Sequence, residues 1–190
     1  RRQQVEGNAL TGFFLMFLLR FGIRWAESVL IQWEGLWEAV SRRQPKVTMQ
    51  PNGVDLKIFR RVEKHPHEGK NIFFVGRLVH QKNVALLIEA AALLRGVSLH
   101  LIGEGPLRRR LTRLAHEKKV HAIFYGNVPY DQIPELLRQA DLFVMPSLFE
   151  GHVKSLTEAM ACGIPCVGTD VDGIRELIQH EKTGLLSPPN

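Results

Sequence analysis

Cysteine is scarce in this chain, which carries two cysteines among 190 residues. Two thiols cannot build the disulfide framework of a small secreted domain, so Cys162 and Cys166 are predicted to be free and to suit a reducing compartment. Zinc binding by this pair is also disfavoured, because Cys166 falls in an apolar segment where a free cysteine behaves as a small hydrophobe. The sequence shows no Ser-His-Asp set, no metal-ligand spacing and no internal repeat. These absences argue against a disulfide-stabilised fold, a metal site and a repeat array.

Long hydrophobic runs are missing as well. Residues 10–23 are apolar, but they are too few, and interrupted by Arg20, for a helix that spans a membrane. The small-residue cleavage site of a secretory signal is also absent. Two interpretations stay open, a helix that packed against an amino-terminal domain and an interfacial anchor supported by Arg24 and Trp25. The packing helix is the favoured interpretation.

Acidic residues are fewer than basic ones, 19 against 25, and the formal net charge is +6. Such a surplus fits an anionic ligand or an acidic membrane surface. The hydrophobic fraction of 45% and the mixed charges are typical of a soluble globular protein. A chain of 190 residues is long enough for one well-buried domain and part of another.

Predicted strands and helices alternate from residue 71 onward. This pattern predicts an α/β fold, a Rossmann-like parallel sheet with helices on both faces. Because crossovers in such a sheet are right-handed, the loops that follow its strands share one edge, where ligands bind. The expected strands are 28–32, 72–75, 97–102, 122–125, 142–145, 165–168 and 184–186, and the expected helices are 34–43, 84–94, 107–118, 132–139, 154–161 and 174–178.

The predicted domain organisation follows from the same pattern. Residues 46–190 form the sheet domain, with a turn at Asn52-Gly53, and residues 1–45 are the remnant of an amino-terminal domain. The first residue is arginine, and the sequence stops directly after a predicted strand. We therefore expect a fragment that is truncated at both ends and lacks the last helices of its domain.

Two carboxylates flank a glycine turn at the start of one predicted helix. Glu150 precedes Gly151, and Glu158 lies further along the helix. Gly151 can adopt the unusual backbone angles of a tight turn, and the free N–H groups of the first helical turn attract phosphate. A carboxylate on the same helix can accept paired hydroxyls. Phosphate donors beside hydroxyl acceptors are the groups that a nucleotide-sugar requires.

These residues resemble the signature of retaining glycosyltransferase family 4, whose members have a GT-B fold of two Rossmann-like domains. The resemblance covers residues 25–190. Further motifs support it in order along the chain: Pro51-Asn-Gly-Val-Asp55 with Phe59, Gly76-Arg-Leu-Val-His-Gln-Lys82, Gly103-Glu-Gly-Pro106, Gly126-Asn-Val128 and Gly168-Thr-Asp-Val-Asp-Gly173. The chain departs from many relatives at Asn83, where they have glycine, and at Val153, where they have proline.

The resemblance implies roles for particular residues. Arg77 and Lys82, with Gly76 letting the backbone approach, would bind the donor diphosphate, where the departing nucleotide accumulates negative charge. Glu150 would contact the hydroxyls of the donor sugar, and Glu158 would accept both ribose hydroxyls. The catalytic set is thus Glu150, Arg77 and Lys82.

Backbone groups complete the implied donor site. Gly151, His152 and Val153 would offer N–H groups to phosphate, and the loops that contain Gly103, Gly105, Pro106, Asn127 and Val128 would hold the nucleotide base. The first of these loops is not a dinucleotide fingerprint, because Arg108 stands where the third glycine belongs. The arginines from 108 to 113 are predicted to wrap around their helix as a solvated basic surface. Nucleic-acid binding is disfavoured because no aromatic stacking platform accompanies them.

The sequence therefore predicts the donor-binding domain of a glycosyltransferase that retains anomeric configuration, with a hexosyl or N-acetylhexosaminyl donor. The family resemblance implies no metal and no cofactor. We expect a carbohydrate, lipid-linked or small-molecule acceptor and a cytoplasmic location, with peripheral membrane association at the inner face as an open option. The fragment alone is expected to be inactive. The alternatives are a nucleotide-sugar 2-epimerase of the same architecture, a non-catalytic nucleotide-sugar-binding module and a membrane-surface adaptor.

Overall fold

The computed structural model describes residues 21–32, 34–42, 46–61 and 69–189. The chain divides into two compact units, with the division between Pro51 and Asn52. The greater part of the apolar segment 10–23 lies outside the described residues. Among the helices that are described, none combines the length and the apolar character needed to cross a membrane.

The first unit contains a small parallel pair of strands. Strand β1 (Val29–Ile31) pairs in register with β2 (Val47–Met49). A 3-10 turn, η1 (Glu34–Leu36), and helix α2 (Trp37–Ser41) lie between them in sequence. The strand at 28–32 and the helix within 34–43 were predicted, whereas β2 was not. Val47–Met49 is too short to show a period-2 pattern, and it becomes a strand through its pairing with β1.

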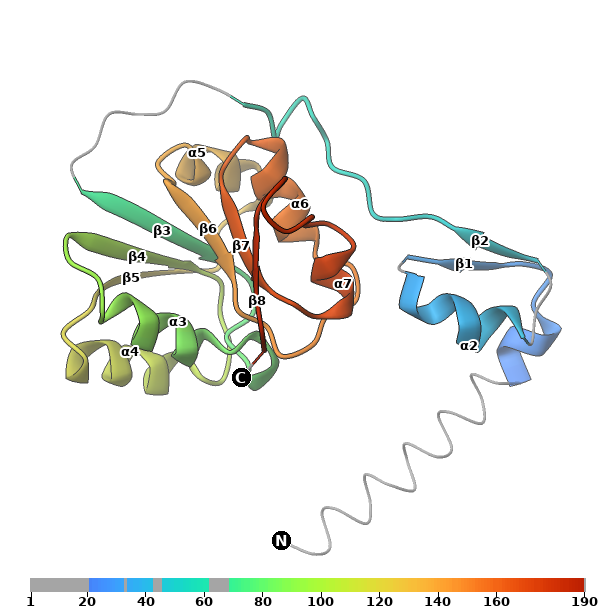
Figure 1. The fold of residues 1–190 in the computed structure, drawn as a ribbon, viewed down its shortest axis with the longest axis horizontal. Coiled ribbons are helices and arrows are strands. Elements are labelled where there is room, and N and C mark those ends of the chain that lie inside the picture. The colour runs from blue at the N-terminus through green and yellow to red at the C-terminus, as the bar shows by residue number, and fades with distance from the viewer. Residues whose placement is uncertain (1–20, 33, 43–45, 62–68, 190) are drawn as a thin grey trace, which may run out of the picture. The chain divides into compact units, whose positions relative to one another are not determined.

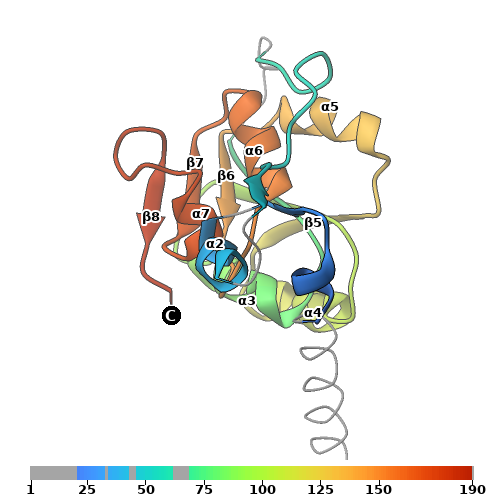
Figure 2. The ribbon, with the colours of Figure 1, turned by 90° about the vertical axis from the view of Figure 1, so that its right-hand side faces the viewer.

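The second unit is a six-stranded parallel sheet in the order β5-β4-β3-β6-β7-β8. Figure 1 shows this sheet with α3 and α4 on one face and α5 and α6 on the other, and Figure 2 shows the same division from the side. The predicted fold, a parallel sheet with helices on both faces, is therefore confirmed. The strands are β3 (Lys70–Val75), β4 (Val97–Ile102), β5 (His121–Gly126), β6 (Leu142–Met145), β7 (Cys166–Thr169) and β8 (Leu185–Ser187), and the helices are α3 (Val84–Ala91), α4 (Arg108–Glu117), α5 (Ile133–Leu137), α6 (Lys154–Ala161) and α7 (Asp172–Arg175), with the 3-10 turns η2 (His80–Lys82) and η3 (Tyr130–Gln132).

Two local predictions were wrong. The expected turn at Asn52-Gly53 is absent, and the chain turns instead after Asp55, whose Oδ1 accepts a hydrogen bond of 2.8 Å from the backbone N–H of Lys57. The last helix covers Asp172–Arg175 instead of the predicted 174–178, so it begins two residues and ends three residues earlier. It begins early because Val171 is extended and its carbonyl accepts the first helical hydrogen bonds, and the small Gly173 fits inside the helix.

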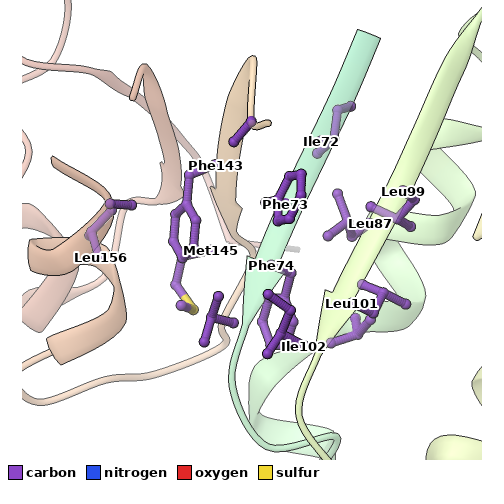
Figure 3. Close-up of a cluster of buried hydrophobic side chains, with 14 of the residues drawn as sticks. Ile72, Phe73, Phe74, Leu87, Leu99, Leu101, Ile102, Phe143, Met145 and Leu156 are labelled. Atoms are coloured by element: carbon purple, nitrogen blue, oxygen red, sulfur yellow. The ribbon is translucent and has the colours of Figure 1, made fainter. Parts of the chain in front are cut away.

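The core residues of the second unit divide between the two faces of the sheet. Phe73 and Phe143 are register partners on β3 and β6, so both rings project to the same face, beside Leu156 of α6 (Figure 3). The neighbours of Phe73 along β3 project to the opposite face, toward Leu87 of α3. Such two-sided burial explains why β3 and β6 read as continuous apolar runs rather than alternating ones.

Both cysteines are free, as the sequence predicted. Cys166 is buried in β7, and burial raises the pKa of its thiol to about 12. A thiol with such a pKa stays protonated and unreactive near neutral pH. Its contribution is therefore apolar packing.

Candidate donor site at the carboxyl edge of the sheet

The strand order reverses between β3 and β6. From β3 the chain proceeds through β4 to β5 on one side, and from β6 it proceeds through β7 to β8 on the other. The loops that follow β3 and β6 therefore diverge from one point at the carboxyl edge of the sheet. Ligands of open α/β sheets bind at such a reversal.

Three contacts join these two loops. The backbone N–H of Leu148 donates to the carbonyl of Gln81 at 2.8 Å, and Gln81 Nε2 donates to the carbonyl of Phe149 at 2.9 Å. Lys82 Nζ lies 2.5 Å from Glu150 Oε1. The ends of η2 and of the loop before α6 are thus fixed against each other.

The Lys82–Glu150 ion pair is largely shielded from solvent, with side-chain exposures of 17% and 7%. Its two members come from positions 68 residues apart in the sequence. An ammonium group has three donors, so Lys82 keeps further N–H groups for a second partner. The pair places a cation that can bind phosphate directly beside a carboxylate that can accept hydroxyls.

Asn83 stands at the junction of η2 and α3 in a left-handed conformation, with φ 47° and ψ 38°. Glycine adopts this conformation without strain, and asparagine adopts it more readily than most other residues. This explains physically how asparagine can replace the glycine that many relatives have there. Asn83 in this conformation ends the η2 turn directly after Lys82.

The loop after β4 packs against the loop after β3 through the backbone. Gly76 donates its N–H to the Ile102 carbonyl at 2.9 Å, and Leu78 donates to the Glu104 carbonyl at 2.8 Å. Gly103 has φ of +129°, and a Cβ there would lie 2.1 Å from the carbonyl oxygen of Gly76. Only glycine permits this approach.

The loop after β5 joins the same cluster. The N–H of Gly103 donates to the carbonyl of Gly126 at 2.8 Å, and the following residues, Asn127 and Val128, are exposed and half-buried respectively. Arg108 forms an ion pair with Glu104 and donates to the carbonyl of Phe124 at 3.3 Å. Four of the five base-site positions, Gly103, Gly105, Asn127 and Val128, thus lie on loops that are tied together. The fifth, Pro106, is exposed just before α4.

The basic surface of α4 differs in one respect from the prediction. Arg108 is turned into the fold by its partners, whereas Arg109, Arg110 and Arg113 are exposed. Those three positions fall within about 100° of the helix circumference, since each residue advances the helix by that angle. The exposed arginines share one face and do not wrap around the helix.

The start of α6 offers backbone donors. Val153 is extended and buried, and no side chain of the described residues caps the helix. Leu156 donates its N–H to the Val153 carbonyl at 3.1 Å, so the N–H groups of Lys154 and Ser155 are the ones without an acceptor within the helix. The backbone of Gly151 packs directly against Gly173, because a Cβ on Gly173 would lie 1.3 Å from the Gly151 carbonyl oxygen. His152 has a buried Nδ1 that forms no hydrogen bond with the described residues.

Glu158 lies one helical turn beyond Lys154 on α6 and is 4% exposed. Its Oε1 is buried and accepts no hydrogen bond from the described part of the chain. Burial raises the pKa of the Glu158 carboxyl, while Tyr130 and Lys154 oppose that rise. A buried carboxylate oxygen with an unused lone pair is suited to accept a ligand hydroxyl.

Not every predicted site residue contacts the others in the structure. Arg77 is exposed and forms no ion pair with the described residues, so its position alone connects it to the site. Two contributors were missed, namely Gln81, which ties the loops together, and Tyr130, which lies against Lys154. Both residues follow predicted strands, and this location at the ligand-binding edge of the sheet is the feature of the sequence that could have identified them. Within the described ranges, no three His, Cys, Asp or Glu side chains lie close enough to hold a metal ion.

Comparison with known proteins identifies the family. Residues 55–190 match the glycosyl transferases group 1 family, and the chain belongs to this family. It is 30% identical over 169 residues to the amylovoran biosynthesis glycosyltransferase AmsK of Erwinia amylovora, which covers 82% of this chain and 42% of that protein. It is 32% identical over 162 residues to the UDP-Gal:alpha-D-GlcNAc-diphosphoundecaprenol alpha-1,3-galactosyltransferase of Escherichia coli, which covers 74% of this chain and 41% of that protein.

The fold is also shared with solved structures. Sucrose-phosphate synthase from Thermosynechococcus elongatus aligns with a TM-score of 0.82 and 26% identity, over 92% of this chain and 48% of that one. The structural neighbours are GT-B glycosyltransferases, as the sequence resemblance implied. The chain spans about two fifths of the length of the curated relatives that it matches.

Proposed function

We propose that this chain carries the donor-binding domain of a retaining glycosyltransferase of family 4. The proposed reaction transfers a hexose or an N-acetylhexosamine from a nucleotide diphosphate to an acceptor. The observation that carries this proposal is the meeting of Lys82, Glu150 and the uncapped start of α6 where the strand order reverses. A cation, a carboxylate and a helix N-terminus match the phosphates and hydroxyls of a nucleotide-sugar. Membership of the family supports glycosyl transfer, and the UDP-Gal donor in the name of one relative supports a nucleotide-sugar donor.

In this proposal the Lys82–Glu150 ion pair belongs to the free protein. The donor diphosphate replaces Glu150 as the partner of Lys82, and Glu150 then accepts hydroxyls of the sugar. Arg77, which is exposed beside Gly76, adds a second cation to the diphosphate. Positive charge held at the leaving nucleotide stabilises the transition state, where negative charge develops on the phosphate.

The remaining residues bind the nucleotide. Glu158 accepts the ribose hydroxyls, and its free Oε1 supports this role. Backbone groups at Gly103, Gly105, Asn127 and Val128 surround the base, which explains why no single side chain there encodes the choice of base.

The proposal includes neither metal nor cofactor, because the cation pair and the helix N-terminus take the part of a divalent ion at the diphosphate. A lipid-linked acceptor is supported by the diphosphoundecaprenol named for the Escherichia coli relative. We also propose that the reaction takes place in the cytoplasm, at the inner face of the membrane.

The first test is calorimetric titration of the chain with UDP, GDP, ADP and their common sugars without divalent metal. We expect one base to bind selectively. Replacing Lys82 or Glu158 by alanine should weaken that binding by about 1.5–3 kcal/mol, or roughly ten- to a hundredfold, because a charge-assisted hydrogen bond is lost. Lys118→Ala removes a positive charge from the exposed end of α4 and should leave affinity unchanged. A folded chain that binds none of these nucleotides, or binds them equally well in all variants, would contradict the proposal.

A further inference from the structure

Lys154 and Tyr130 form a cluster around Glu158 to which the family motif assigns no role. Lys154 Nζ lies 4.2 Å from the centroid of the Tyr130 ring and 3.7 Å from Glu158 Oε1. The Tyr130 ring in turn packs on the fully buried Phe59, with 5.2 Å between the ring centroids. Side chains from three segments that are distant in the sequence, Phe59, Tyr130 and Lys154, thus pack in a row that ends at the Glu158 carboxylate.

The geometry indicates how Lys154 acts. A separation of 3.7 Å is too long for a hydrogen bond, so the ammonium group stabilises the charge of Glu158 without occupying Oε1. The carboxylate side chain is 5% exposed, whereas the lysine side chain is 51% exposed. Desolvation therefore penalises the carboxylate far more than the lysine, and the nearby positive charge offsets part of that penalty.

Tyr130 explains why a flexible lysine stays in place. A cation over an aromatic face is attracted by the ring quadrupole, and Phe59 holds that ring from behind. Tyr130 also raises the pKa of Lys154, which keeps the ammonium group charged. A lysine in solvent would otherwise sample many rotamers away from Glu158.

We propose that Lys154, held against the ring of Tyr130, is a positioning residue for Glu158 that lets this buried carboxylate stay ionised and keep Oε1 free for a nucleotide hydroxyl. This inference rests on the proposed function of Glu158 in ribose binding. Lys154 itself touches neither base nor phosphate in this arrangement. Its effect on binding is indirect and should depend on pH.

Tyr130 also acts on Glu158 directly, and its effect is the largest single one that lowers the pKa of that carboxyl. The remaining groups that influence Glu158 are few among the described residues. Cys162, one turn further along α6, interacts electrostatically with Glu158, and burial raises the pKa of its thiol. Arg138, just after α5, acts on Cys162 and is part of the same surroundings. Cys162 is uncharged near neutral pH, because burial raises the pKa of its thiol. Within the part of the chain that the structure describes, Lys154 is the cation that forms an ion pair with the carboxylate.

The decisive experiment follows the Glu158 carboxyl by NMR in chain labelled with carbon-13 at glutamate, from about pH 4 to about pH 8.5, a range that spans a raised glutamate pKa. The signal that Glu158→Gln removes belongs to Glu158. We expect Lys154→Met to move its titration to higher pH and Lys154→Arg to restore it. Lys118→Met removes a lysine from the end of α4, on the other face of the sheet, and should have no effect. An unchanged Glu158 titration in Lys154→Met would overturn the proposal.

A parallel titration measures binding of uridine, guanosine and adenosine and of their diphosphates. For the preferred base, Lys154→Met should weaken nucleoside and diphosphate equally, by roughly tenfold near about pH 6 and by less near about pH 8.5, because the carboxylate ionises again as the pH rises. Weakening confined to the diphosphate would show that Lys154 contacts phosphate, which would overturn the proposal. Failure of the unaltered chain to bind any of these ligands would overturn the proposed function, while the NMR titration still decides whether Lys154 acts on Glu158.

Discussion

Glu158 keeps one carboxylate oxygen without a hydrogen bond from the described residues although its side chain is buried. At the scale of the single residue, this arrangement favours binding and disfavours stability. A carboxyl whose pKa is raised by folding holds its proton more tightly in the folded state. Its contribution to stability is therefore present below the ordinary glutamate pKa and is lost as the pH rises through the raised value. At neutral pH the ionised Glu158 destabilises the fold.

Glu158→Gln should therefore raise the midpoint temperature of unfolding at neutral pH, by roughly 2–4 °C if the gain is about 1 kcal/mol. The gain should disappear near about pH 3, below the ordinary glutamate pKa, because the carboxyl is then protonated in both states. Calorimetric scans at the two pH values check this. Glu117→Gln changes an exposed glutamate on α4 and should leave both midpoints unchanged. A midpoint for Glu158→Gln that is equal to or lower than that of the unaltered chain at neutral pH would be evidence against a destabilising carboxylate.

At the scale of the element, the position of α6 depends on a neighbouring helix. Gly173 lies in α7, and its N–H donates to the carbonyl of Glu150 at 3.3 Å. The absence of a side chain on Gly173 lets α7 press against the loop that carries Glu150 and Gly151. Interiors packed to this density transmit a displacement rather than absorb it.

Gly173→Ala should therefore impair both stability and binding. The added Cβ would fall 1.3 Å from the Gly151 carbonyl oxygen, so the backbone has to move. We expect a loss of about 1–3 kcal/mol in the free energy of unfolding, measured by urea denaturation, together with weaker nucleotide binding. Gly53→Ala is the matched control, because no atom lies within 4 Å of a Cβ at that position. Equal stability of the two variants would mean that the contact between α7 and the loop is not tight in solution.

At the scale of the whole molecule, the family resemblance implies that the donor site and the acceptor site belong to different domains. The described site lies wholly within residues 52–190, the second unit. The relatives are more than twice as long as the part matched here. We therefore expect the acceptor site to correspond to the part of the relatives that this chain does not match.

The chain by itself should bind the donor without transferring sugar. Incubation with the preferred nucleotide-sugar and a lipid-linked acceptor should give no product above the level of the Glu150→Ala variant, because the acceptor is not held in line with the donor. The assay follows labelled sugar in the acceptor fraction. Transfer above that level would refute the expectation, and the anomeric configuration of the first product would then test retention directly. Free epimerised sugar as sole product would favour the 2-epimerase instead.

The sequence by itself determined most elements of the sheet domain, and it supplied most of the candidate site residues. Strands 97–102 and 142–145 and helix 154–161 were predicted with the bounds observed, because their apolar runs and helical periodicity are local properties. Glu150, Gly151 and Glu158 could likewise be singled out from the sequence, since they belong to one contiguous motif. Among the features that were missed, β2 and the early start of α7 depend on pairing and packing with distant residues.

Tertiary structure alone decided which of these residues meet. Lys82 and Glu150 lie 68 residues apart, and they become partners because β3 and β6 are neighbours at the point where the strand order reverses. The position of Lys154 over Tyr130 likewise requires the loop after β5 to reach α6. Local patterns specify which segments become strands and helices. Contacts between side chains from distant segments arise only when the packed sheet fixes the order of its strands.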